Sequence, residues 1–158
     1  MRHLIEDRGA SAEEAERAAA QSDGVVGRAL EIWERGPGDA TESGARLLSA
    51  ALSGDARARF EAAGAFSARG ARAALQPALE ALRAQLRDVL AHATGAAELP
   101  PGLPSLRGRP LAPGALLTAM EAVEDALEGV AQNLNPQATV SVLLGDMNRV
   151  LAASTREP

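Results

Sequence analysis

Two long stretches of the sequence repeat apolar residues in alternating steps of four and three. The first seam consists of Leu75, Leu79, Leu82, Leu86, Val89 and Ala93, and the second of Leu116, Met120, Val123, Leu127, Val130 and Leu134. This spacing lines apolar side chains along one side of an α-helix, which must then be buried against a neighbouring helix. The two seams therefore predict two long helices that pack in a bundle.

The composition favours helices elsewhere in the chain as well. Of the 158 residues 46% are hydrophobic but only 2% are aromatic, and no run alternates apolar and polar residues as a strand would. We expect short helices around residues 26–35, 47–52 and 56–66. A last helix should begin where Asn135 caps it and Pro136 takes its first position. The prediction is an all-α protein.

Glycine and proline mark the predicted boundaries. The break Gly36-Pro37-Gly38-Asp39 separates a small helical domain, residues 1–36, from a bundle of about five helices, residues 37–158. Residues 95–114 hold five prolines and lose the helical period, so we expect a long, stiff, exposed loop. Pro77 falls inside the first seam, where it should either start the helix or kink it.

Several classes of chemistry are excluded by residues that the sequence lacks. It contains no Lys, hence no Schiff-base or phosphate-loop lysine, and no Cys, hence no disulfide or thiolate metal site. A net charge of −5 argues against a nucleic-acid surface. No apolar run approaches the roughly 20 residues of a membrane span, and no signal peptide is seen. The expected location is the cytoplasm.

Candidate catalytic and metal-binding residues are few. His3 and His92 are far apart in sequence, and each lies at an expected helix end. A charge partner for a helix terminus is the favoured interpretation of such a histidine over a ligand or a base. The Ser and Thr residues have no His or Asp arrangement that would activate a nucleophile. We therefore expect no enzyme, no cofactor and no metal.

Charged residues form two stripes on the predicted long helices. The acidic stripe is Glu121, Glu124, Asp125 and Glu128, and the basic stripe is Arg69, Arg72, Arg83 and Arg87. Clustered carboxylates could hold a divalent cation, but a solvated outer face is the favoured interpretation for an amphipathic helix. Stripes of opposite sign also pair across helices or between subunits.

Three short segments follow one another in an informative order. The first runs from Gly24 to Leu30 and contains Gly27, Arg28 and Ala29; the second is Leu86-Arg87-Asp88; the third is Asn133-Leu134-Asn135-Pro136. In this order they resemble the C-terminal part of bacterial DNA polymerase III clamp-loader subunits, most closely the delta-prime type. There, a lid domain ends with a Gly-x-x-x-x-Ala-Leu helix. The collar domain that follows often carries Leu-Arg-Asp, and its last helix begins after Asn-x-Asn-Pro.

The resemblance implies a structural role. Residues 1–36 would be a remnant of the lid and residues 37–158 the collar, which joins clamp-loader subunits in a ring that loads the sliding clamp. The implied partners are the other clamp-loader subunits, with no direct contact to nucleic acid. A subunit interface is expected at Arg83, Arg87, Asp88, Glu121, Asp125, Asn135 and Pro136.

One position separates the delta-prime type from its closest relatives. Subunits that hydrolyse ATP keep a sensing Arg in the lid helix, in a Gly-Ser-x-Arg-x-Ala-Leu pattern, where this sequence has Gly27. Arg28 is one residue late, which is about 100° of rotation on a helix. The family's nucleotide-binding domain has no counterpart in the sequence, so a fragment is expected. The lid and collar of an ATP-hydrolysing subunit, or a generic helical adaptor, stay open as alternatives.

Overall fold

The computed structural model describes residues 38–67, 71–98, 106 and 109–154. These ranges contain five helices and no strand, which confirms the predicted all-α class and the predicted bundle. The helices are α4 (Gly38–Leu52), α5 (Ala56–Gly64), α6 (Ala71–Ala93), α7 (Pro113–Ala131) and α8 (Pro136–Ser154). None of them is long and apolar enough to cross a bilayer.

The chain divides into two units between Asp39 and Ala40, and nearly all of the described residues belong to the second. The predicted small domain, residues 1–36, lies outside the described residues.

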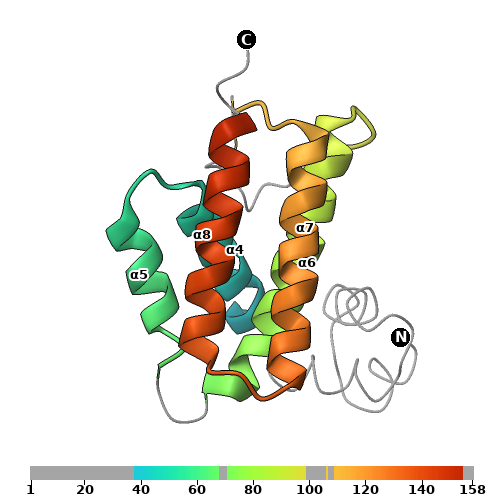
Figure 1. Cartoon of the computed structure of the whole chain (residues 1–158). Coiled ribbons are helices and arrows are strands. Elements are labelled where there is room, and N and C mark those ends of the chain that lie inside the picture. The colour runs from blue at the N-terminus through green and yellow to red at the C-terminus, as the bar shows by residue number, and fades with distance from the viewer. Residues whose placement is uncertain (1–37, 68–70, 99–105, 107–108, 155–158) are drawn as a thin grey trace, which may run out of the picture. The chain divides into compact units, whose positions relative to one another are not determined.

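The bundle is built around the pair α7 and α8 (Figure 1). A short turn joins these two helices, so that they run antiparallel; α6 packs on α7 and α5 packs on α8. Contacts with both α6 and α8 tie α4 into the same body. The core consists of the inward side chains of these helices, most of them Leu and Ala.

The helices α6 and α7 pack through the two predicted seams. Five of the six residues of the first seam are buried, and only Ala93 is exposed. Arg83 on α6 lies opposite Glu124 on α7, and Arg72 lies opposite Asn133, so the two helices run antiparallel. Small residues on α7, Ala119 and Ala126, are also buried, which lets neighbouring helices approach closely.

The last residue of the second seam does not follow the prediction. Because α7 ends at Ala131, Leu134 lies in the turn that follows it, and 54% of its surface is exposed. The reason is local. Asn133 adopts a φ of 64°, in the left-handed region, and this ends the helix before the seam is complete.

The helices α4 and α6 make backbone contact at one point. A Cβ placed on Gly44 would lie 2.8 Å from the backbone nitrogen of Leu82 and 3.1 Å from the carbonyl carbon of Ala81. Real Cβ atoms do not approach backbone so closely, so the helices can cross here only because residue 44 has no side chain. Next to the crossing, Gln85 Nε2 donates a hydrogen bond of 2.9 Å to the carbonyl oxygen of Thr41.

The C-terminal end of α4 is held by three side chains from other parts of the bundle. Asn148 on α8 donates to the carbonyl oxygens of Ala51, at 2.8 Å, and of Ser53, at 2.9 Å. Arg59 on α5 also donates to the Ser53 oxygen, and Arg109 donates to the Leu52 oxygen, both at 2.8 Å. The last carbonyl groups of a helix lack partners within it and carry partial negative charge, which two guanidinium groups neutralise well.

The structure narrows one sequence-based expectation and corrects another. Of the two roles expected for Pro77, the start of the long helix is excluded, because α6 begins six residues earlier at Ala71. The segment 95–114 is not an exposed loop throughout: in its described part Leu106 and Leu111 are buried, with 5% and 7% of their surfaces exposed. Both side chains join the core of the bundle, so these two positions do not extend into solvent.

Candidate functional site

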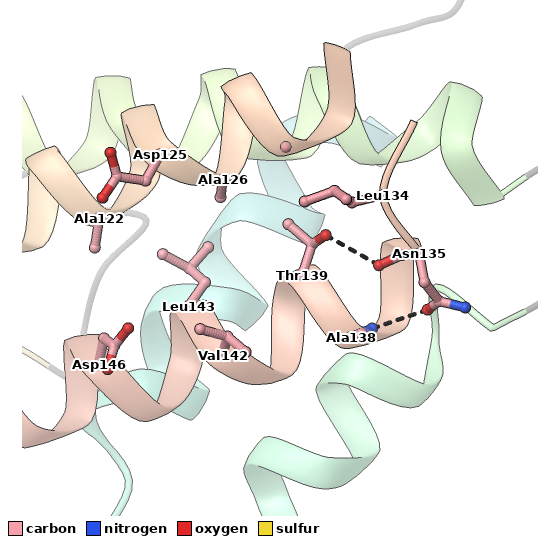
Figure 2. Close-up of a pocket in the computed structure, with 11 residues that line it drawn as sticks. Ala122, Asp125, Ala126, Leu134, Asn135, Ala138, Thr139, Val142, Leu143 and Asp146 are labelled. Atoms are coloured by element: carbon pink, nitrogen blue, oxygen red, sulfur yellow. Dashed lines mark hydrogen bonds between the residues drawn. The ribbon is translucent and has the colours of Figure 1, made fainter. Parts of the chain in front are cut away.

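A groove with a volume of about 490 Å³ lies between α7 and α8. Its walls are mostly apolar and come from facing positions on the two helices (Figure 2). Ala122 and Ala126 line it from α7, and Ala138, Val142 and Leu143 line it from α8. All of its lining residues belong to α7, to α8 or to the turn between them.

Two large apolar side chains in this groove are exposed to solvent. They are Leu134, with 54% of its surface exposed, and Val142, with 66%. Burying a Leu or Val side chain contributes about 1.5–3 kcal/mol, so leaving two of them on one surface forgoes a sizeable stabilisation. Apolar residues gathered in a concave surface are typical of binding sites.

The turn between α7 and α8 sets the position of Leu134. Asn135 Oδ1 accepts a hydrogen bond of 3.0 Å from the backbone nitrogen of Ala138 and so caps α8, whose first residue is Pro136. The predictions that Asn135 caps this helix and that Pro136 takes its first position are thereby confirmed. Gly129 leaves the space that Leu134 occupies, because a Cβ there would lie 3.1 Å from Leu134 Cδ1.

Arg72 fixes the same turn from α6. Its guanidinium donates to the carbonyl oxygens of Asn133, at 3.0 Å, and of Leu134, at 3.2 Å, and also to Asn133 Oδ1. Arg72 thus holds Asn133, the left-handed residue, through both the side chain and the backbone of Asn133. One residue of the predicted basic stripe is therefore a positioning residue for the groove.

The charged residues that line the described groove are both acidic. Asp125 on α7 and Asp146 on α8 lie at the end of the groove that is distant from the turn (Figure 2). Asp146 forms an exposed ion pair of 2.9 Å with Arg149, whereas Asp125 has no hydrogen bond or ion pair within the described ranges. The groove consequently has an apolar end at Leu134 and an acidic end.

The structure separates the other residues that were predicted to form a subunit interface. Arg83 Nη1 lies 3.0 Å from Glu124 Oε1, so one pair of the two stripes meets across helices within the chain, as one interpretation of the stripes expected. Arg87 and Asp88 are exposed on α6, and Glu121 is exposed on α7 outside the groove. Only Asp125 and Asn135 of the predicted set line the groove.

The remaining predicted residues are the lid-helix motif and a histidine at the end of α6. The lid-helix motif of Gly24, Gly27, Arg28, Ala29 and Leu30 lies outside the described residues. His92 is described; its Nδ1 lies 3.2 Å from the carbonyl oxygen of Ala97, just beyond the end of α6, as a helix-end role would place it. In the described ranges no group of three or more His, Cys, Asp or Glu residues could hold a metal ion.

Sequence reasoning missed Val142 and Asp146 as groove residues, and it assigned Leu134 to a buried seam. A signal for Val142 was present. Residues 140–144 include four large apolar residues, Val140, Val142, Leu143 and Leu144, more than one face of a helix can bury. At about 100° per residue Val142 points away from the other three. One apolar residue of the four had to lie on a second face.

Comparison of the chain with protein-family models, with curated proteins and with solved structures finds no match. The resemblance to clamp-loader subunits therefore stays a prediction that rests on the three sequence segments.

Proposed function

We propose that this chain is a non-catalytic protein-interaction module that binds its partner through the α7–α8 groove. The observation that carries the proposal is the pair of exposed side chains Leu134 and Val142 beside an apolar floor. A partner that covers both side chains removes apolar surface from water, which is the main driving force of protein association.

The resemblance supplies a more specific proposal. The module would be the collar of a delta-prime-like subunit in a cytoplasmic DNA polymerase III clamp loader, and it would join the other subunits in a ring for DNA replication. Two of the three resembling segments lie in the described bundle. One contributes the exposed residues Arg87 and Asp88 on α6, and the other, from Asn133 to Pro136, forms the turn at the apolar end of the groove.

Size-exclusion chromatography with purified clamp-loader subunits from the same genome tests this specific proposal. The chain should co-elute with them at micromolar concentration, and Val142→Asp should weaken the complex. Leu117→Asp is the matched control, because Leu117 is 51% exposed on α7 but does not line the groove. Failure of the wild-type chain to co-elute would remove the clamp-loader assignment and leave a generic adaptor.

An ATPase assay on the full gene product, without the other subunits, separates the two clamp-loader alternatives. A delta-prime-like module should neither bind nor hydrolyse ATP, alone or in the full gene product. Turnover by the full gene product, carried by a phosphate-loop lysine encoded upstream of Met1, would instead identify the lid and collar of an ATP-hydrolysing subunit.

A further inference from the structure

We infer that the α7–α8 groove takes an amphipathic helix of a partner protein, with an apolar ridge at its centre and an Arg or Lys at one end. The inference rests on the proposed function, and adds the chemistry of the partner segment and its direction in the groove. The argument comes from the length of the groove, its apolar walls and the charges at one of its ends.

The length of the groove matches a short helical segment. On α8 its lining extends from Ala138 to Asp146, which is about 12 Å at 1.5 Å per residue. This is about two turns of a partner helix, enough for apolar side chains at positions i, i+3 or i+4, and i+7. A groove between two antiparallel helices accepts such a ridge by the same packing that joins helices in a core.

The two ends of the groove define where the apolar and the basic residues of the partner helix lie. At the turn, Leu134 presents an exposed apolar surface, so an apolar residue of the partner belongs there. Asp146 lies about three helical turns along α8 from its first residue, Pro136. It faces the groove together with Asp125 of α7 (Figure 2). An Arg of the partner that reaches this end would lie between two carboxylates from different helices.

The charges argue for a cationic partner. A partner that covered Asp125 without supplying a cation would bury a carboxylate that has no partner within the described ranges, which is costly. The ion pair of Asp146 with Arg149 is no obstacle, because both side chains are largely exposed, at 44% and 78%, and such pairs contribute little. A partner guanidinium can therefore pair with Asp125, and Asp146 supplies a second carboxylate at the same end of the groove.

A second copy of this groove does not supply that cation. The charged residues that line it in the described chain are both acidic, and the neighbouring outward residues of α7, Glu121 and Glu128, are acidic too. A two-fold pairing of this face with itself would bring two acidic linings together, and Arg149 of each copy is already paired with Asp146. The charge pattern hence favours a different protein.

Selection from a phage-displayed library of random 16-residue peptides tests the inference. The full chain can be immobilised at one point, because a sequence without Lys leaves the N-terminal amine as its only primary amine. The enriched peptides should share apolar residues at helical spacing and an Arg or Lys at one end. Titration of ¹⁵N-labelled chain should shift the amide signals of Ala122, Ala126 and Leu143.

Variants of the chain then identify the contacts. Val142→Asp should lower the affinity for the selected peptides by about tenfold or more, as loss of a central apolar contact does. Asp125→Arg should lower the affinity for basic peptides by a similar factor. Exchange of the peptide's Arg for Glu should then restore binding to that variant. Leu117→Asp lies outside the groove and should leave the affinity unchanged. Unchanged circular dichroism verifies that the variants fold.

Each other outcome overturns the inference in a recognisable way. Enriched peptides that bind Val142→Asp as well as wild type would place the binding surface elsewhere, while the chain would still be an interaction module. Failure to enrich any peptide would reject a helical occupant even if the chain co-elutes with clamp-loader subunits. A dimer by light scattering that Val142→Asp dissociates would make a second copy the occupant.

Discussion

Arg72 and Asn133, which are 61 residues apart, join the start of α6 to the turn between α7 and α8. The guanidinium meets both the side chain and the carbonyl oxygen of Asn133, the one described residue other than glycine with a positive φ. A left-handed non-glycine residue costs free energy unless its surroundings hold it, and Arg72 is the side chain that does so here.

Replacing Arg72 by Ala should lower the free energy of unfolding by about 1 kcal/mol, because three hydrogen bonds to the turn are lost at an exposed position. Urea denaturation measures the change. The matched control is Arg87→Ala on the same helix, which is exposed and makes no hydrogen bond or ion pair within the described ranges. It should change stability by less than about 0.5 kcal/mol. Equal effects of the two variants would contradict the holding role of Arg72.

A methyl group at Gly44 should destabilise the bundle although Ala is the better helix former. The added Cβ meets the backbone of α6 at 2.8 Å, so α4 and α6 must move apart, which should cost about 1–3 kcal/mol. Gly145→Ala on α8 is the control, because a Cβ there has nothing within 4 Å. It should stabilise the bundle by about 0.5–1 kcal/mol. Thermal and urea unfolding of both variants compare the signs, and stabilisation by Gly44→Ala would refute the close crossing.

Substitutions of Asn148 should distinguish the loss of hydrogen bonds from the introduction of a repulsion. Asn148→Ala removes two donated bonds to the end of α4 and should cost about 1–2 kcal/mol. Asn148→Asp should cost more, since a carboxylate then faces two carbonyl oxygens at the negative end of a helix. Arg149→Ala, at the next position, breaks only a surface ion pair and should cost less than about 0.5 kcal/mol. Chemical denaturation gives the order, and an Asp variant no worse than Ala would disprove the contact.

The ion pair of Arg83 with Glu124 should contribute little to stability. Its side chains are 38% and 53% exposed, so a double-mutant cycle with Arg83→Ala and Glu124→Ala should give a coupling energy of about 0.2–1 kcal/mol. The coupling should shrink as salt rises from 0.05 to 0.5 M. A coupling well above this range, or one insensitive to salt, would mean that the pair is shielded from solvent by another part of the protein.

The bundle could be read from the sequence wherever the helical period is strong. The run from Leu75 to Val89 identified α6 and its buried side, because five apolar residues in steps of four and three fit only one side of a helix. The burial of Leu106 and Leu111 was not predicted, because both lie in a proline-rich segment that has no helical period. An isolated Leu carries no period, and only the packing of the whole chain shows that it is buried.

The groove was less accessible to sequence reasoning than the helices that form it. Asp125 was singled out as part of a stripe, but the carboxylate that joins it, Asp146, comes from another helix. That both line one groove depends on how α7 and α8 are rotated against each other. The residue pattern of a single helix does not define that rotation.

The end of α4 has a consequence for how the protein is made. Its carbonyl oxygens accept hydrogen bonds from Asn148, which lies 97 residues further along the chain than Ala51 and is therefore synthesised later. A ribosome that adds about 5–20 residues per second therefore releases α4 several seconds before its final partner is synthesised. The first helix of the bundle is completed by the last, so folding should finish only once α8 has left the exit tunnel. Nascent chains that stop short of α8 should be substrates for chaperones, whereas the full-length chain should not.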